Sequence, residues 1–270
     1  MADLIDAVGT VHTRAVGDVR IVSLVPSLTE LLFDLGLGPH VVGRTHFCVH
    51  PADCVAEVKS VGGTKKISMR KLVELAPTHV ILNIDENTEA MGQAIAATVP
   101  NVIVTHPIEP QDNVAVYELL GSVFGREKEA NGLRTRFSEA FASLVDAAQD
   151  WPSQRVLYLI WKDPWMTVSH DTYVSRLLAL AGWHTVGHDD SVRFPEVEID
   201  EDLLAGTDLV LFSSEPYAFK PEDIMAFATD NAFGSARLLP IDGEMTSWYG
   251  SRAVMGLTYL RRFATVLLDA

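Results

Sequence analysis

The chain has 270 residues, of which 48% are hydrophobic, and its 36 acidic residues outnumber 21 basic ones to give a net charge of −15. That apolar content is typical of a folded globular protein and excludes a disordered chain. Nucleic acid is excluded as a partner, because its phosphates require an electropositive surface. The apolar runs, such as residues 209–212, are far shorter than the ~20 residues of a membrane helix, so no membrane insertion is expected.

The N-terminal segment lacks the pattern of a secretory signal. It begins acidic, and Asp6, His12 and Arg14 interrupt any apolar stretch of the ~7–15 residues that a signal requires. We therefore expect the chain as written in the cytoplasm, or in the periplasm if a leader has been removed. Cys48 and Cys54 are too few for a disulfide framework or a zinc tetrad, and ordinary thiols in or near the core are expected.

Strands and helices alternate in the first half of the chain. Residues 20–25 form a β-rich run, and Ser27 and Glu30 have capping-box spacing at the start of a helix that Gly36 ends. Further helices are predicted at 69–75 and 86–98, with strands at 79–83 and 102–105. This alternation favours a mostly parallel sheet covered on both faces.

A long helical pattern occupies the middle of the chain. Residues 112–124 predict one helix, Gly125 interrupts it, and residues 127–149 predict another with a continuous apolar stripe. The stripe consists of Leu133, Phe137, Phe141, Leu144 and Ala148. At ~1.5 Å per residue this second helix spans roughly 35 Å, which suits a strut between two lobes.

The α/β pattern resumes after Pro152. Strands are predicted at 155–160, 209–212 and 238–241, and helices at 173–181, 221–229 and 251–268. We therefore expect an α/β protein of two lobes with mostly parallel sheets. Its predicted parts are an N-terminal extension (1–19), an N-terminal lobe (20–111), a linking backbone helix (112–151) and a C-terminal lobe (152–270).

Unusual residues gather in the expected loops, where α/β folds place ligands. His46 and His50 are either axial ligands of cobalt or iron or ordinary loop histidines. The turn at 61–66 carries Lys65, which either meets an anionic ligand group or is simply solvated. No phosphate-binding loop, nucleophile elbow or strong zinc signature is present.

Aromatic residues recur in the loops of the second half. Their position outside the core periodicity suits a flat ligand that stacks on them, although such side chains also seal the ends of sheets. The residues are Trp161, Trp165, Phe194, Tyr217, Trp248 and Tyr249. Glu215 and Glu244 add carboxylates, which either face a ligand or cap helices.

Several motifs together resemble the helical-backbone metal receptor superfamily. The motifs are Val-Pro-Ser-Leu-Thr-Glu at 25–30, Val-Gly-Gly-Thr-Lys at 61–65, the Leu75-to-Ile81 segment, Pro-Trp-Met-Thr at 164–167 and Ser-Trp-Tyr-Gly-Ser-Arg at 247–252. These receptors are the class III substrate-binding proteins of ABC importers for cobalamin, haem and iron-siderophores. The resemblance runs from about Arg20 to the C-terminus, and its specificity lies in the order and spacing of the motifs.

The resemblance implies two α/β lobes joined by one long helix, with cobalamin or a similar metal chelate bound in the cleft between them. It implies a transport protein with no enzymatic activity and no covalent cofactor. With the loop residues above, it gives a predicted ligand set of Phe47, His50, Thr64, Lys65, Trp165, Met166, Phe194, Tyr217, Trp248, Tyr249 and Arg252, with His50 and His46 as candidate metal ligands. Thr64 stands where the cobalamin-binding members have a tryptophan.

Docking to a permease is implied for only one lobe. Glu201 matches the C-lobe glutamate that pairs with permease arginines, whereas Arg70 occupies the N-lobe position and repels an arginine. Because only one lobe carries the docking glutamate, the role of the bound ligand is left open between transport, storage and sensing.

Two alternatives to a chelate-binding protein are also considered. The first is a protein that binds a free zinc, manganese or iron ion through His46, His50, Glu215 and Glu244. The second alternative is an enzyme whose nucleophile is a Cys48 thiolate flanked by His46 and His50.

Overall fold

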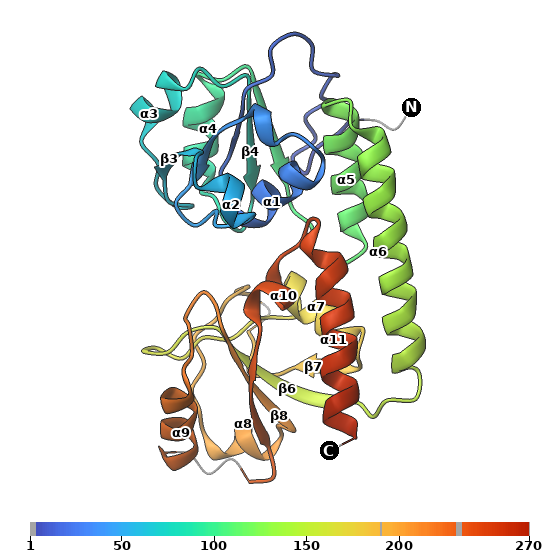
Figure 1. The fold of residues 1–270 in the computed structure, drawn as a ribbon. Coiled ribbons are helices and arrows are strands. Elements are labelled where there is room, and N and C mark those ends of the chain that lie inside the picture. The colour runs from blue at the N-terminus through green and yellow to red at the C-terminus, as the bar shows by residue number, and fades with distance from the viewer. Residues whose placement is uncertain (1–3, 190, 231–233, 270) are drawn as a thin grey trace. The chain divides into compact units, whose positions relative to one another are not determined.

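The structure, a computed structural model, describes residues 4–189, 191–230 and 234–269 and divides into two compact units (Figure 1). Unit 1 comprises the described part of 1–107 together with Gln111–Phe137 and Tyr249–Arg252. Unit 2 comprises Ile108–Pro110, Ser138–Trp248 and the described residues from Ala253 onward. The division at 137/138 falls inside a single helix, α6 (Glu127–Ala148).

Unit 1 is built on a five-stranded sheet in the order β3-β2-β1-β4-β5, in which every neighbouring pair is parallel. Its strands are β1 (Ile21–Ser23), β2 (Val41–Thr45), β3 (Lys59–Gly62), β4 (His79–Asn83) and β5 (Asn101–Thr105). Its shorter helices are α1 (Pro26–Asp34), the 3-10 turn η1 (Gly38–His40), α2 (Ala52–Val55), α3 (Met69–Glu74), α4 (Glu89–Ala96) and α5 (Asp112–Val123). The parallel sheet confirms the α/β class expected from the alternating pattern.

The core of unit 1 follows the alternation of side chains along its strands. Val22, Val80 and Leu82 point to one face, where Leu72 of α3 and Ile95 of α4 pack against them. Figure 1 shows α4 on one side of β4 and α5 on the other. Because both faces are covered, β4 is buried at all of its positions and reads as a nearly continuous apolar run.

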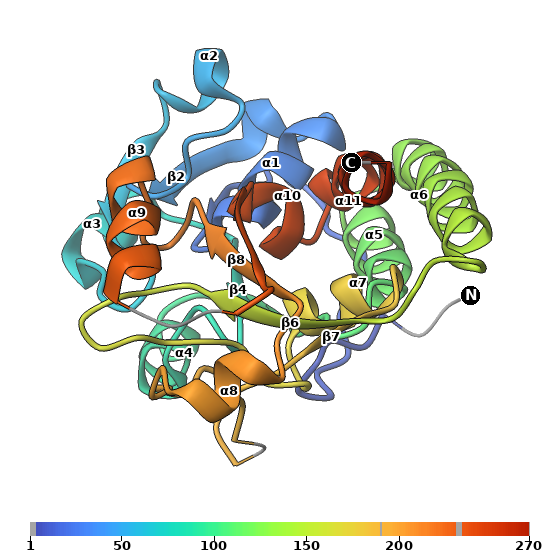
Figure 2. The same ribbon diagram turned by 90° about the horizontal axis from the view of Figure 1, so that it is seen from below.

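Unit 2 has a four-stranded parallel sheet in the order β7-β6-β8-β9. Its strands are β6 (Gln154–Leu159), β7 (Trp183–Thr185), β8 (Leu209–Ser213) and β9 (Arg237–Ile241). Its helices are α7 (Tyr173–Ala179), α8 (Glu201–Ala205), α9 (Pro221–Asp230), α10 (Gly243–Ser247) and α11 (Arg252–Leu268), whose first residue belongs to unit 1. Helices α8 and α9 lie on one side of the sheet and α11 on the other (Figures 1 and 2). Phe212 packs against Leu204 of α8 and Phe227 of α9.

Helices α5 and α6 confirm the long helical pattern of the middle segment. Gly125 has a φ of +65°, a conformation that glycine adopts without strain, and it separates the two helices. Leu133, Phe137 and Leu144 of the predicted stripe are buried. Among the described residues, no helix is both long and apolar enough to cross a membrane.

The start of α1 differs from the prediction. The helix begins at Pro26, and Val25 is its N-cap without any side-chain hydrogen bond. Proline suits this first helical position because it has no N–H to leave unsatisfied and its φ is already helical. Ser27 therefore lies within the first turn, and Glu30 pairs with Arg252. The capping-box interpretation was wrong.

The N-terminal segment pairs with the edge strand β5. The backbone N–H of Ala7 donates to the carbonyl of Val104 at 2.9 Å, and the N–H of Val104 donates to the Asp6 carboxylate at 3.0 Å. The same carboxylate lies 3.0 Å from His12 Nε2, and its side chain is fully buried. This segment therefore satisfies backbone groups that an edge strand otherwise leaves open.

Candidate functional site

Parallel α/β sheets bind ligands beyond the carboxyl ends of their strands, at the point where the strand order reverses. The strand orders place this point between β1 and β4 in unit 1 and between β6 and β8 in unit 2. The loops that follow these strands and their neighbours are therefore the candidate ligand loops of each unit.

Asn87 ties three loops of unit 1 together. Its buried amide donates to the carbonyl of Leu24 after β1 at 3.3 Å and to that of Thr64 after β3 at 2.9 Å. Its side-chain oxygen accepts from the backbone N–H of Asn83 at 2.9 Å. The predicted residue Thr64 is thus held in a fixed loop. Sequence reasoning missed Asn87, whose signal was a polar residue shortly after a strand with an apolar centre.

Lys65 is anchored to the same set of loops. Its ammonium group donates to the carbonyl oxygen of Asp85 at 2.5 Å, and Asp85 itself lies 3.4 Å from His106. The lysine side chain is exposed and keeps two further N–H donors. It therefore bridges the loops after β3 and β4 while retaining capacity for an anionic group.

His46 and Phe47 form an exposed ring pair just after β2. Their ring centroids are 4.1 Å apart, and Phe47 is 52% exposed. A Cβ at Gly63 would lie 3.2 Å from His46 and 3.4 Å from Phe47, so glycine lets the loop after β3 approach both rings. The predicted residue His50 lies in the same loop and is half-buried. Phe47 thus presents an aromatic surface on which a flat molecule can stack.

Cys48 is unsuited to nucleophilic catalysis. It is fully buried, and its sulfur lies 3.1 Å from the hydroxyls of both Thr29 and Thr45. Burial raises the pKa of the Cys48 thiol, which disfavours the thiolate that attacks a substrate. Cys54 is exposed, so the expectation that both thiols lie in or near the core was wrong for Cys54.

Arg252 and Tyr249 belong to unit 1 and are buried there. The Arg252 guanidinium donates to both carboxylate oxygens of Glu30, at 2.8 and 2.7 Å. Burial, followed by the nearby charge of Glu86, raises the pKa of the Tyr249 phenol well above its ordinary value. Gly250 between them is held by Asn113 at 2.6 Å. The structure thus gives Arg252 an internal partner, and its contact with a ligand stays a prediction.

An exposed tryptophan follows β6 in unit 2, and a half-buried tyrosine follows β8. Trp161 is 40% exposed and lies edge-on to Tyr217, with 5.5 Å between the ring centroids. Lys162 lies 5.4 Å from the Tyr217 centroid and pairs with Asp223, which raises the pKa of the lysine. The predicted residue Tyr217 therefore sits at the switch point, beside Trp161. The predicted ligand set omitted Trp161, although its place directly after a strand was a usable signal.

Trp165 packs inward at the margin of the core. It stacks on Phe219 with ring centroids 6.0 Å apart and meets Phe227 edge-on at 5.4 Å. Met166 is half-buried and forms backbone bridges to Trp161 and Glu196. These contacts supply a packing role, and ligand contacts for Trp165 and Met166 stay predictions.

Phe194 lies in a loop that is tied to the same region of unit 2. It is 37% exposed. The carbonyls of its neighbours Arg193 and Pro195 accept hydrogen bonds from the backbone N–H groups of Ser169 and Thr167, at 2.9 and 3.0 Å. Phe194 is therefore an exposed aromatic residue on a loop whose backbone is pinned on either side of it.

Trp248 is buried against a carboxylate in unit 2. Its indole N–H donates to Glu215, and the hydroxyl of Ser247 donates to the same oxygen at 2.9 Å. Burial raises the pKa of Glu215, and the two donated hydrogen bonds oppose that shift. At 7% exposure Trp248 offers little open surface, so its predicted place on a ligand wall stays a prediction.

The residues considered for permease docking are all on the surface. Glu201 is exposed at the start of α8, where Asp200 caps the helix. Arg70 is exposed in α3, with its guanidinium 3.7 Å from Glu74 one turn later. Both side chains are open to solvent and available to a partner.

A free metal ion has no ready site in the part of the chain that is described. Within that part, no three His, Cys, Asp or Glu side chains are grouped as such a site requires. His46 and His50 belong to unit 1, whereas Glu215 and Glu244 belong to unit 2, so the alternative in which all four hold one ion stays a prediction.

Two parallel-sheet units that carry exposed aromatic residues beyond their strands define a two-lobed α/β ligand-binding protein. Sequence comparison agrees: the chain belongs to the periplasmic binding protein family, whose model matches residues 21–224. This is a family of ligand-binding transport proteins rather than enzymes.

Individual relatives are distant in sequence. The chain is 20% identical to the vitamin B12-binding protein of Photorhabdus laumondii over 202 residues, covering 75% of this chain and 73% of that protein. It superposes on the periplasmic vitamin B12 binding protein BtuF of Vibrio cholerae with a TM-score of 0.80 at 17% identity, covering 93% and 98% of the two chains. It superposes on the apo form of the periplasmic heme-binding protein RhuT from Roseiflexus sp. RS-1 with a TM-score of 0.73 at 22% identity, covering 92% of this chain and 98% of that chain. At these identities the structural likeness establishes the fold alone.

Proposed function

We propose that this chain is the substrate-binding component of an ABC importer and carries a flat metal chelate, with cobalamin as the first candidate ligand. Haem and iron-siderophores are the other members of this ligand class. Support comes from the family and from relatives whose names state vitamin B12 or heme binding. The names of the two structural relatives also state that they are periplasmic, and we place this chain in the same compartment.

The observation that carries the proposal is the exposure of aromatic rings beyond the strands of both units. Phe47 in unit 1 is 52% exposed, and Trp161 in unit 2 is 40% exposed. An exposed aromatic ring does not gain the free energy that its burial would provide. Stacking on the face of a corrin or porphyrin would bury the ring and provide that free energy. We infer that Phe47, Trp161 and Tyr217 provide the main apolar contacts.

An imidazole beside these rings favours haem as a second candidate. His46 is exposed and its ring contacts Phe47, and His50 lies in the same loop. A neutral imidazole is the commonest protein ligand of haem iron. Replacing His46 with alanine is expected to change the Soret band of bound haemin, and replacing His50 is the matched comparison. If neither change alters the spectrum, the iron takes no imidazole from this loop.

Delivery to a permease is proposed to rest on surface charge. Glu201 is the proposed contact on unit 2, and Arg70 is expected to oppose docking through unit 1. An Arg70→Glu variant should then associate faster with a permease that presents arginines, most strongly at low salt. Equal association rates for both forms would contradict this docking arrangement.

The decisive experiment is a titration with cyanocobalamin, cobinamide and haemin in parallel, followed by absorbance and calorimetry. Saturable 1:1 binding of one of them is expected. Phe47→Ala and Trp161→Ala should each weaken it by roughly threefold to tenfold, the value of one aromatic stacking contact. Trp151→Ala is the matched control, because Trp151 lies shortly before β6 in the chain and so at the opposite end of that strand from Trp161. Unchanged affinity in both aromatic variants would refute the proposed contacts.

A further inference from the structure

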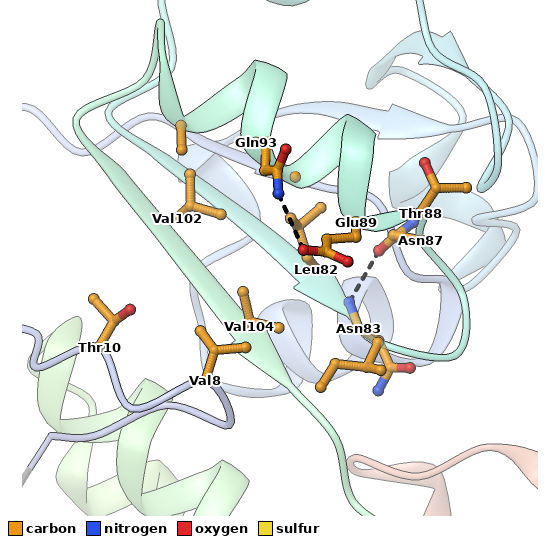
Figure 3. Close-up of a pocket in the computed structure, with 13 residues that line it drawn as sticks. Val8, Thr10, Leu82, Asn83, Asn87, Thr88, Glu89, Gln93, Val102 and Val104 are labelled. Atoms are coloured by element: carbon orange, nitrogen blue, oxygen red, sulfur yellow. Dashed lines mark hydrogen bonds between the residues drawn. The ribbon is translucent and has the colours of Figure 1, made fainter.

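A pocket of about 440 Å³ lies in unit 1 between α4, the edge strand β5 and the N-terminal segment (Figure 3). This volume falls within the roughly 300–1,000 Å³ that is typical of small-molecule sites. None of the residues predicted to bind the metal chelate lines the pocket. It is therefore a separate candidate site.

The floor of the pocket is apolar because α4 leaves part of the sheet uncovered. Leu82, Val102 and Val104 form it, and Gly92 of α4 faces them without a side chain. A Cβ built on Gly92 would meet only Leu82, at 3.3 Å. The absence of a side chain at this one helical position therefore keeps the space open.

The N-terminal wall of the pocket is held by hydrogen bonds to Asp6. Val8 and Thr10 line it, and Figure 3 shows Val8 beside Val104. The buried Asp6 carboxylate accepts from the backbone N–H of Val8 at 3.1 Å and from that of Thr10 at 2.8 Å. It also accepts from Val104, so the wall and the strand share one anchor.

The polar side of the pocket is a carboxylate. Glu89 is exposed on α4 and accepts one hydrogen bond from Gln93 at 3.0 Å, which leaves further acceptor capacity on its oxygens. Asn83 and Asn87 also line the pocket, but their amides bond to Thr105, to backbone groups and to the loops described above. Among the lining residues that the structure describes, Glu89 is the only charged one.

We propose that this pocket binds a small amphiphilic cation, with an apolar chain against Leu82, Val102 and Val104 and an amine or ammonium group at Glu89. An uncharged apolar molecule would leave the carboxylate unused, and an anion would be repelled by it. The chain's net charge of −15 also favours cationic ligands.

The test is a titration with n-octylammonium, followed by methyl NMR of the valines and leucines. Saturable shifts are expected at Val8, Leu82, Val102 and Val104. In a butyl, hexyl, octyl series the affinity should rise about fourfold per methylene until the pocket is filled. Octan-1-ol should bind more weakly than octylammonium, and octanoate should bind weakest. No saturable shift, or equal affinity for all three head groups, would overturn the proposal.

Two variants separate the apolar and charged contributions. Glu89→Gln should weaken octylammonium by up to about fivefold and leave octan-1-ol unchanged, whereas Glu118→Gln on α5 is a matched control for loss of an exposed carboxylate. Gly92→Leu fills the pocket, removes a helical glycine and should abolish the shifts, with Gly92→Ala giving a partial effect. Unchanged octylammonium binding in Gly92→Leu would overturn the site. Its titration with cyanocobalamin should match the parent chain, which distinguishes this proposal from the chelate site.

Discussion

Breaking the Glu30–Arg252 pair is expected to destabilise unit 1 strongly. The Arg252 and Glu30 side chains are only 6% and 13% exposed, and two charge-assisted hydrogen bonds of 2.8 and 2.7 Å join them. Removing one partner of a buried pair leaves an uncompensated charge and costs about 3–5 kcal/mol. The partial exposure of Glu30 admits water, so we expect about 3 kcal/mol for Glu30→Gln.

Urea unfolding can locate this effect because the tryptophans report on one unit. All 5 tryptophans lie in unit 2, so their fluorescence follows that unit, whereas far-UV circular dichroism follows both. At an m-value of about 2 kcal/mol per M, 3 kcal/mol moves the unfolding midpoint by about 1.5 M. The shift should be larger by circular dichroism than by fluorescence.

A double variant distinguishes a buried ion pair from simple packing. Glu30→Leu with Arg252→Met removes both charges, keeps apolar volume, and should recover much of the loss seen for Glu30→Gln. A loss below about 1 kcal/mol for Glu30→Gln would place the pair among surface ion pairs and refute the reasoning. A double variant no more stable than the single one would refute it equally.

Three further predictions concern other buried groups. Asp6→Ala should lower the free energy of unfolding by about 1–3 kcal/mol, because the backbone N–H of Val104 loses its acceptor. Asp18→Ala, at an exposed position, should leave the free energy of unfolding unchanged, and equal losses in the two variants would contradict this prediction. Burial raises the pKa of Glu215 above its ordinary value of 4.5, so the stability it contributes is present below that value and is lost as pH rises through the native pKa. Relative to Glu215→Gln, the parent chain should therefore lose stability as the pH rises above about 4.5, measured by tryptophan-monitored urea unfolding, and parallel pH profiles would count against it. In the native protein a thiol reagent should modify Cys54 rapidly and Cys48 only after unfolding, because Cys48 is buried and the pKa of its thiol is raised. Rapid modification of two thiols per native chain would contradict this prediction.

Sequence periodicity predicted the fold well where the signal was local. The helix predicted at 127–149 is Glu127–Ala148, and the strand predicted at 79–83 is β4 with those bounds. The short strands β3 and β7 were not predicted. Lys59–Gly62 has one large apolar residue and Trp183–Thr185 has three residues in all, so neither carries a pattern that stands out from a loop. Their pairing with longer neighbours makes them strands.

The site was harder to predict because its partners are distant in sequence. Glu30 and Arg252 are 222 residues apart. Local spacing therefore suggested a helix cap for Glu30, and the family resemblance suggested a ligand contact for Arg252. Asn87 bonds to Leu24, 63 residues away, and no local pattern reveals that contact. Sequence located the loops, whereas the direction of each side chain within them follows from tertiary packing.

The segment 247–252 shows how tertiary packing of the loop side chains affects ligand recognition. Ser247 and Trp248 already donate to Glu215, and Arg252 donates to Glu30. Redirecting any of these hydrogen bonds to a ligand gives up a bond to a carboxyl group, at about 1.5–3 kcal/mol for each where that group is charged. Trp161 faces no such loss: covering the exposed 40% of its side chain recovers on the order of 2 kcal/mol. Binding energy is therefore expected to come mainly from exposed rings such as Trp161 and Phe47, while the polar residues of 247–252 hold the loops in shape.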